Sequence, residues 1–267
     1  MRKVGLLAGV GRLPVEFARA ASGMGIAVIS VKLVPGVDED LAAVSAKSYD
    51  ISVGELERII TALKEEGVLE VTMLGKVTKE LIFSGCAVAD ERMKRLLGGL
   101  KDYNDDTIML AFVRELATEG IGVLDQTALI RALMPGPGIL TNRGPTESEA
   151  EDMDYGFSMA KEIGALDIGQ TVVVKDKAVM AVEAIEGTDA CIRRGAKLSR
   201  GGAVVAKVAK PNQDMRFDVP GVGQDTIKAM IEGGATALAF EAGKTLLAER
   251  DKVISLANEH GITIVAK

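Results

Sequence analysis

The chain has 267 residues and a formal net charge of −6, with 48% hydrophobic residues, 3% aromatic residues and no tryptophan. Such an acidic chain lacks the basic surface and the stacking side chains that nucleic-acid binding needs. Two cysteines, Cys86 and Cys191, are too few for a disulfide framework, and no apolar run reaches the roughly 18 residues of a membrane-spanning helix, so we expect a cytoplasmic protein of one large or two medium domains.

The first third of the chain alternates strand and helix patterns. A strand pattern at Val4–Ala8 leads through a glycine turn into a helix pattern, Val15–Met24, and a second strand pattern, Ile26–Leu33. This order is typical of the start of a doubly wound parallel sheet. The turn places backbone N–H groups at a helix N-terminus, where a phosphate can bind, although a purely structural turn is the alternative. The candidate substrate contacts are Gly9, Gly11, Arg12 and Leu13.

A dinucleotide such as NAD is disfavoured at this turn. The third glycine of the dinucleotide fingerprint is missing, and the next strand ends in Lys32 instead of an acidic residue. Further along, Gly75 and Lys76 follow the strand pattern Val71–Leu74, at the end of a parallel strand where such sheets bind ligands. Helix patterns also occupy Glu55–Glu66, Asp90–Leu97 and Thr107–Thr118, the last capped by Asp105 or Asp106, and a short strand pattern occupies Val123–Leu124.

Met134–Gly138 is the best candidate for a domain boundary, because two prolines and two glycines in five residues end a helix or a central strand. We therefore predict a Rossmann-like nucleotide-binding domain at 1–133 and a mixed α/β catalytic domain at 139–267. Just beyond the boundary, Thr146 and Glu149 have the spacing of a helix capping box. The acids around them, Glu147, Glu151, Asp152 and Asp154, suit a helix N-terminus, with metal binding as the minor alternative.

The second domain again mixes strands and helices. The expected elements are a helix at Phe157–Ala165, a hairpin of Thr171–Val174 and Val179–Ala184, a helix carrying Cys191, a buried strand at Ala203–Ala209, a helix at Thr226–Ile231, a strand at Thr236–Phe240, the longest helix at Lys244–Asn258 and a strand at Ile262–Ala266. Gly187, Thr188 and Asp189 open one helix and form either an anion site or an ordinary threonine cap. Glu241 follows a strand and is a candidate ligand contact.

The segment Lys210–Gly223, KPNQDMRFDVPGVG, carries more charge than a turn needs. Its Gly, Pro, Asn and Asp residues are typical turn formers, but Lys210, Asp214, Arg216 and Asp218 are not required for geometry. Cations beside carboxylates are what a phosphate site with a hard metal ion requires. A solvated turn with a surface ion pair is the alternative. Gln213 and Gly223 of this segment are further candidates for substrate contact.

The residue inventory narrows the chemistry. The single histidine, His260, ends the last helix pattern, and the cysteines lack the spacing of metal ligands. No GxSxG, HExxH or GxxxxGK[ST] motif occurs. Phosphoryl chemistry carried by carboxylates, lysines, arginines, backbone amides and a metal ion remains.

Five segments, AGVGRLP at 8–14, GKV at 75–77, EAIEGTDA at 183–190, the segment from Lys210 and FEAGKTLL at 240–247, occur in an order that resembles a known family. The family is the UDP-2,3-diacylglucosamine pyrophosphatase of lipid A biosynthesis that is unrelated to the calcineurin-like phosphoesterases. The resemblance runs over essentially the whole chain. Val10 departs from it, because family members often carry a further glycine there.

The resemblance implies a Rossmann-like N-terminal domain and a C-terminal α/β domain that hold the substrate between them. It implies Mg²⁺- or Mn²⁺-dependent hydrolysis of UDP-2,3-diacylglucosamine to UMP and 2,3-diacylglucosamine 1-phosphate (lipid X). It places the essential aspartate at Asp218, which binds metal or activates water, and Asp214 shares that role. Lys210 and Arg216 would neutralise phosphate charge. The lipid substrate implies contact with the inner-membrane surface, and a homodimer is compatible with the resemblance.

Two other functions are alternatives. A non-catalytic nucleotide-binding module would bind the UDP-sugar without turnover. An NAD(P)-dependent reductase would share the fold class but conflicts with the incomplete glycine turn.

Overall fold

The computed structural model describes residues 1–77, 89–211, 214–217 and 219–267. Cys86, Gln213 and Asp218 lie outside the described residues. The described chain divides into two compact units. The first comprises Met1–Ile130 together with Met215–Phe217, and the second comprises Arg131–Asp214 together with the described residues 219–267.

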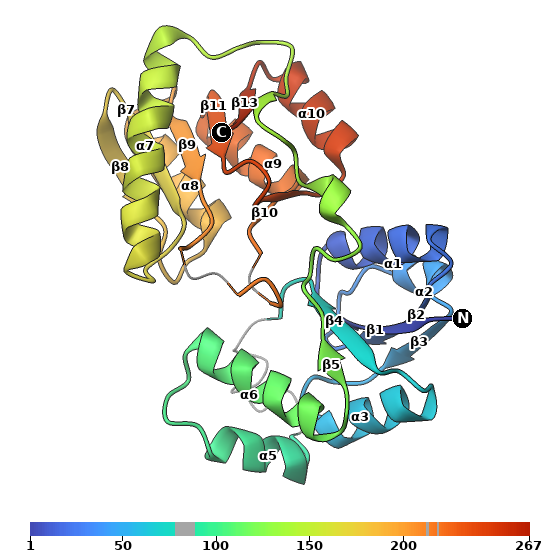
Figure 1. Ribbon diagram of the computed structural model, residues 1–267. Helices are drawn as coiled ribbons and strands as arrows, with labels where there is room; N and C mark the ends of the chain where they lie inside the picture. The colour runs from blue at the N-terminus through green and yellow to red at the C-terminus, as the bar shows by residue number, and fades with distance from the viewer. Residues whose placement is uncertain (78–88, 212–213, 218) are drawn as a thin grey trace. The chain divides into compact units, whose positions relative to one another are not determined.

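The first unit is built on a sheet whose described strands all run parallel in the order β3-β2-β1-β4-β5. Its three inner strands, β2, β1 and β4, are mostly apolar and buried because helices cover both faces of a parallel sheet, whereas the edge strand β3 is polar. Figure 1 shows α1 and α2 on one face and α3, α5 and α6 on the other. The Rossmann-like prediction is confirmed. The elements are β1 (Lys3–Ala8), α1 (Leu13–Gly23), β2 (Ala27–Lys32), α2 (Asp40–Val44), β3 (Lys47–Asp50), α3 (Leu56–Glu65), β4 (Glu70–Leu74), α5 (Glu91–Gly98), α6 (Asp105–Thr118) and β5 (Gly122–Val123).

The second unit contains a mixed sheet with the described strands in the order β6-β13-β11-β9-β7-β8. Strands β9, β11 and β13 are mutually parallel, whereas β7 is antiparallel to both of its neighbours and β6 is antiparallel to β13. The predicted mixed α/β class is therefore confirmed. The elements are a 3₁₀ turn at Arg131–Leu133, β6 (Gly138–Ile139), α7 (Glu147–Ala165), β7 (Thr171–Lys175), β8 (Ala178–Val182), α8 (Thr188–Ser199), β9 (Val204–Lys207), α9 (Gln224–Gly233), β11 (Ala237–Phe240), α10 (Arg250–Glu259), β13 (Thr263–Ala266) and a small parallel pair, β10 (Gly221–Val222) and β12 (Leu246–Leu247).

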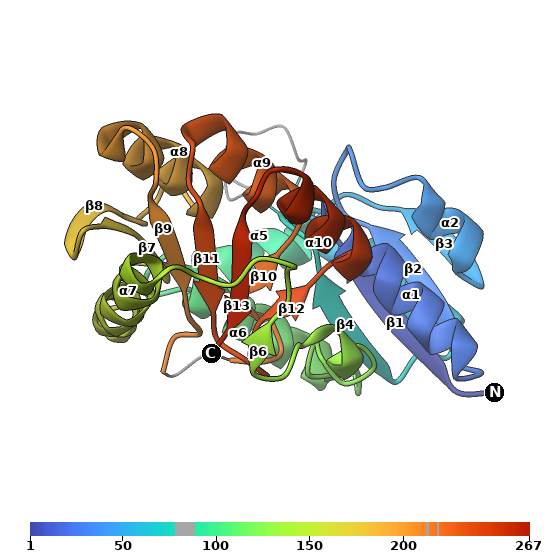
Figure 2. The same ribbon diagram turned by 90° about the horizontal axis from the view of Figure 1, so that it is seen from above.

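Strand β9 is buried on both faces. Val205 packs with Ile192 of α8 and Met230 of α9, while its neighbour Val204 packs with Met153 of α7. Successive side chains of a strand point to opposite faces, so two helical layers need two apolar sets. Figure 2 shows α7 on one side of this sheet and α8, α9 and α10 on the other. This arrangement explains the nearly unbroken apolar run through β9.

One predicted helix is wrong. Lys244–Asn258 is not continuous, because Leu246–Leu247 pairs with Gly221–Val222 as a strand and the helix begins only at Arg250. Of the described helices, α7 is the longest, with 19 residues. The two-residue strand β12 depends on a partner about 25 positions earlier in the chain. The periodicity of the local sequence cannot predict such a pairing.

Of two local predictions, the hairpin of β7 and β8 is right and the cap of α6 is wrong. The hairpin of β7 and β8 is confirmed, and its turn residues Asp176 and Lys177 have φ of 51° and 56°. The cap of α6 is Asn104, not Asp105 or Asp106, because the helix already begins at Asp105. Within the described ranges, no helix is both long enough and apolar enough to cross a bilayer.

Candidate active site

Four strands of the second unit end at the same edge of the sheet. Strands β8, β9, β11 and β13 run in one direction, so their carboxyl ends, and the residues that follow, share that edge. Open α/β sheets bind ligands at this edge. The charged residues there are Glu183 after β8, Lys207 at the end of β9, Glu241 after β11 and Lys267 after β13. We call this set the carboxyl edge of the second unit.

Lys207 and Glu183 are joined through a hydroxyl group. The Lys207 ammonium donates to Thr188 Oγ1 over 2.9 Å, and the Thr188 hydroxyl donates to Glu183 Oε1 over 2.8 Å. The backbone N–H of Gln170 donates to the other carboxylate oxygen of Glu183 at 3.4 Å. Lys207 is 5% exposed and Glu183 is 7% exposed. The carboxyl edge thus contains a buried cation whose position is set by side chains from two other segments.

Glu241 anchors the start of the charged loop. Its carboxylate accepts from the Ala209 N–H at 2.9 Å and from the ammonium groups of Lys161 at 2.5 Å and Lys244 at 2.9 Å. Burial alone would raise the pKa of Glu241, but the hydrogen bonds from Lys161, Lys244 and Ala209 outweigh it and lower that pKa. Ala209 immediately precedes Lys210, so the carboxylate predicted as a substrate contact holds the base of the loop.

The N-terminal turn of α8 also lies at this edge. Gly187 is its N-cap with φ of 81°, a conformation that favours glycine, and it gives no side-chain cap. The Thr226 hydroxyl in the first turn of α9 lies 3.3 Å from Asp189 Oδ1 in the first turn of α8. Gly223, the N-cap of α9, therefore lies near the predicted anion site at Gly187–Asp189.

The charged loop itself spans both units. Lys210 pairs with Asp167 at 2.7 Å, and half-buried Asp214 also belongs to the second unit. Arg216 lies in the short segment that belongs to the first unit, where the Gln126 N–H donates to the Met215 carbonyl at 2.8 Å. The predicted residues Gln213 and Asp218 lie outside the described residues.

In the first unit, the turns after β1 and β4 lie back to back. Val10 and Lys76 exchange two backbone hydrogen bonds of 2.9 Å and 2.7 Å. A Cβ atom on Gly9 would lie 2.6 Å from the Lys76 carbonyl oxygen, and one on Gly75 would lie 2.5 Å from the Gly9 carbonyl oxygen. Only glycine fits at these two positions, so the structure brings Gly9, Gly75 and Lys76 together as a close backbone pair.

The turn leading into α1 holds the remaining predicted residues of this unit. Gly11 has φ of 122°, whereas Val10 has a negative φ. The backbone at position 10 therefore does not require the glycine that family members often carry there. The Arg12 guanidinium contacts the carboxylates of Asp38 and Asp40, each at 2.7 Å. Its hydrogen bond lowers the pKa of Asp38. Arg12 thus shares its charge with two carboxylates beside Leu13, the first residue of α1.

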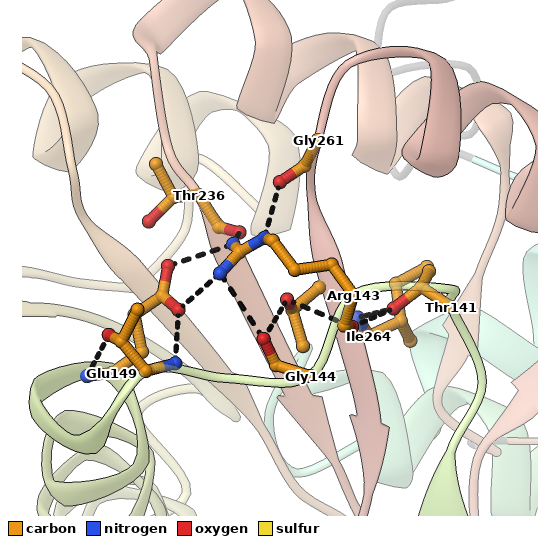
Figure 3. A network of polar contacts seen from close by, with 9 residues as sticks. Thr141, Arg143, Gly144, Glu149, Thr236, Gly261 and Ile264 are labelled. Atoms are coloured by element: carbon orange, nitrogen blue, oxygen red, sulfur yellow. Dashed lines mark hydrogen bonds and ion pairs between the residues drawn. The ribbon is translucent and has the colours of Figure 1, made fainter.

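The acidic stretch at the start of α7 has a structural role. The capping box of Thr146 and Glu149 is confirmed. Figure 3 shows Glu149 paired to Arg143, which also donates to the backbone carbonyls of Thr236 and Gly261. The two contacts between Arg143 and Glu149 measure 2.7 Å and 2.9 Å. Burial acts to raise the pKa of Glu149, but Arg143 and the Thr146 N–H lower it to about 2. This network lies at the amino end of β11, away from the carboxyl edge.

Neither a metal-binding cluster nor a reactive thiol occurs among the described residues, and the predicted metal ligand Asp218 lies outside them. No group of three or more His, Cys, Asp or Glu side chains in the described part of the chain is placed to hold a metal ion. His260 forms the C-cap of α10. Cys191 is buried, as predicted, and burial raises the pKa of its thiol to about 12, so it stays protonated near neutral pH.

Sequence reasoning missed Lys207, Glu183 and Lys161. One signal was present, because Lys207 is the only charged residue in the apolar run Ala203–Ala209. A lysine that interrupts a buried strand needs a partner or a function.

Comparisons with known proteins agree with the order of the motifs. The family described as the LpxI N-terminal domain matches residues 3–133, and the LpxI C-terminal domain matches residues 136–265. The UDP-2,3-diacylglucosamine pyrophosphatase LpxI of Caulobacter vibrioides is 34% identical to this chain, over 99% of this chain and 97% of its own length.

Other similarities are partial. The bifunctional purine biosynthesis protein PurH of Bradyrhizobium diazoefficiens is 31% identical over 48% of this chain and 24% of its own length. A UDP-glucose-4-epimerase structure from Stenotrophomonas maltophila, with bound NAD and formylated UDP-arabinopyranose, is 11% identical, covers 45% of this chain and 35% of that chain, and has a TM-score of 0.30, too low for any inference. The similarity that spans both units decides the assignment: this chain belongs to the LpxI family.

Proposed function

We propose that this protein hydrolyses the pyrophosphate bond of UDP-2,3-diacylglucosamine in lipid A biosynthesis and releases UMP and 2,3-diacylglucosamine 1-phosphate. The observation that carries the proposal is the 34% identity to the Caulobacter vibrioides pyrophosphatase over 99% of the chain. In the reaction, a water oxygen bonds to one phosphorus, the bridging P–O bond breaks, and the bridging oxygen leaves with the other phosphate. The water releases a proton.

The carboxyl edge of the second unit supports this chemistry. Its buried Lys207 and the loop that begins at Lys210 bring cations to one edge of a sheet, and cations lower the barrier by neutralising charge on phosphoryl oxygens. Arg216 stays a sequence prediction, because it lies in the short segment that belongs to the first unit. Asp218 is proposed as the essential carboxylate that binds metal or activates water.

A divalent metal is part of the proposal. Mg²⁺ is commonly bound by one or two carboxylates together with substrate phosphates, and Mn²⁺ accepts similar ligands. Asp214 and Asp218 would supply those carboxylates, a donor set of hard oxygens that fits this chemistry. When bound, the ion supplies charge neutralisation at the diphosphate.

Incubating the purified protein with UDP-2,3-diacylglucosamine and Mg²⁺ tests the proposal. UMP release at a saturable rate supports the hydrolase. Tight binding without any product would instead support a non-catalytic UDP-sugar sensor, and cofactor-dependent reduction would support a reductase.

We also propose that the protein meets a membrane surface at this edge. Three large apolar side chains are exposed on two loops here: Leu166 (70%), Ile168 (48%) and Ile185 (98%). The loops are neighbours, because a Cβ on Gly169 would lie 2.2 Å from the Glu183 carbonyl oxygen. Exposed apolar side chains beside a site for a diacylated substrate suit the boundary between lipid headgroups and acyl chains.

Vesicle sedimentation tests this contact. Replacing Leu166, Ile168 and Ile185 with Ser should reduce binding to phospholipid vesicles and slow hydrolysis of vesicle-borne substrate, without lowering the melting temperature. Leu198→Ser is the matched control, because Leu198 is 61% exposed near the end of α8, away from the carboxyl edge. Equal loss of binding in the control would refute a specific lipid-facing edge. The oligomeric state stays a prediction.

A further inference from the structure

Lys207 is a charged residue in the interior of the second unit. It ends β9, where the register places it beside Thr171 of β7 and Phe240 of β11, and it is only 5% exposed. Lysine is almost never fully buried without compensation, because removing an ammonium group from water is costly. A buried lysine at the carboxyl end of β9, the edge of the proposed site, therefore needs a functional or structural reason.

The position of the Lys207 ammonium is fixed by a directional chain of hydrogen bonds. The Thr188 hydroxyl has one proton, which it donates to Glu183 over 2.8 Å, so it presents a lone pair to Lys207 at 2.9 Å. The Gln170 N–H adds a contact of 3.4 Å to the second oxygen of Glu183. These groups come from β9, the first turn of α8 and the segments that flank β7 and β8.

The setting of Lys207 differs from that of the cation predicted from sequence. Lys210 lies on the loop and pairs with Asp167, whose side chain is 68% exposed. Lys207 is held on the sheet itself, within a desolvated shell. Fixed charges in water-excluded surroundings stabilise developing charge better than mobile ones, because little reorganisation is needed during the reaction.

We propose that Lys207 is a catalytic residue that contacts the substrate diphosphate, and that Thr188 and Glu183 are positioning residues for its ammonium group. This inference rests on the proposed hydrolase function. Lys207 keeps its protons throughout. It neutralises charge on a phosphoryl oxygen while water bonds to phosphorus, the bridging P–O bond breaks, and the electron pair of that bond leaves with the bridging oxygen.

The test compares kcat and KM for UDP-2,3-diacylglucosamine in wild type and in Lys207→Met. We expect kcat to fall about 100-fold or more, with KM changed less than about threefold. In Lys207→Ala, ethylammonium should restore kcat about tenfold in a saturable manner, an effect that a merely structural lysine would not produce. Normal kcat in Lys207→Met, or no amine rescue in a folded Lys207→Ala, overturns the proposal.

A matched control lies at the other end of α8. The half-buried Lys175 donates to the carbonyls of Ser199 and Gly201 at 3.0 Å and 2.9 Å. Lys175→Met should lower the melting temperature and leave kcat unchanged; an equal fall in kcat would mean that loss of either lysine acts through stability.

A second pair of variants keeps the test decisive if Lys207→Met does not fold. Thr188→Ser retains the hydroxyl and should keep kcat within about threefold, whereas Thr188→Val should lower kcat about tenfold or more at unchanged KM. Equal activity of the two variants overturns the positioning role. If wild type itself releases no UMP, the hydrolase proposal fails first, so the two failures are distinguishable.

Discussion

Replacing Glu241 with Leu tests how the base of the charged loop is held. The change removes a carboxylate that accepts from the buried Ala209 N–H and from the ammonium groups of Lys161 and Lys244. Leucine has a similar size, so the space stays filled while the acceptors disappear.

The expected loss of stability can be worked from these contacts. Leaving the buried Ala209 N–H without an acceptor costs about 1–3 kcal/mol. Each lysine pair adds about 0.5 kcal/mol, because the side chains of Lys161 and Lys244 are 35% and 59% exposed and regain water. We therefore expect Glu241→Leu to lower the free energy of unfolding by about 2–4 kcal/mol. Glu241→Gln keeps an acceptor oxygen for Ala209 and should lose only about 1 kcal/mol.

Urea unfolding followed by circular dichroism measures these losses, and hydrogen exchange at the Ala209 amide reports the contact directly. Protection should be lost in Glu241→Leu and kept in Glu241→Gln, and UMP release should fall about tenfold only in the leucine variant. Lys244→Met is the control, with a change below about 0.5 kcal/mol. A leucine variant as stable as wild type, with its Ala209 amide still protected, would refute the anchoring role.

Three further predictions concern other parts of the chain. Asp218→Ala should lower kcat at least about 100-fold at similar KM, and EDTA should stop UMP release until Mg²⁺ or Mn²⁺ is added back; activity that survives both treatments would remove the carboxylate and the ion from the mechanism. Gly75→Ala places a methyl group 2.5 Å from the Gly9 carbonyl oxygen and should cost more than about 3 kcal/mol in thermal unfolding, against about 1–2 kcal/mol for Gly11→Ala, where the space is open. The pKa of Glu149 is lowered to about 2, so its stabilising contribution is complete above about pH 4.5 and is lost as the pH falls toward 2. Glu149→Gln should therefore show a weaker dependence of unfolding free energy on pH between 6 and 3, and an unchanged dependence would contradict this assignment.

Most features set by neighbours in sequence were predicted, with the cap of α6 as an exception. The capping box of Thr146 and Glu149 needs only residues three apart, and the hairpin turn at Asp176–Lys177 follows from two adjacent apolar runs. The alternation of strand and helix in the first 77 residues predicted the parallel sheet, because its inner strands are apolar on both faces. These sequence patterns are local, so they predict the structure without knowledge of tertiary contacts.

Features set by distant neighbours were missed. Glu183 follows β8 and Lys207 ends β9, and β7 separates these two strands in the sheet, so only the sheet order places them on either side of Thr188. The sequence around Leu246–Leu247 has a helix pattern, but these two residues form a strand because they pair with Gly221–Val222. The contact of Glu241 with Ala209 depends on the parallel neighbours β9 and β11, while its predicted contact with ligand stays a prediction.

The inclusion of Met215–Phe217 in the first unit has a consequence for how the protein is made. On the ribosome, Ile130 emerges long before Met215, and at roughly 5–20 residues per second the interval lasts several seconds. During that time the first unit lacks the segment whose carbonyl meets the Gln126 N–H. The amino-terminal half therefore completes its fold only after most of its successor has been translated, and a nascent chain stalled near residue 200 would carry both halves unfinished.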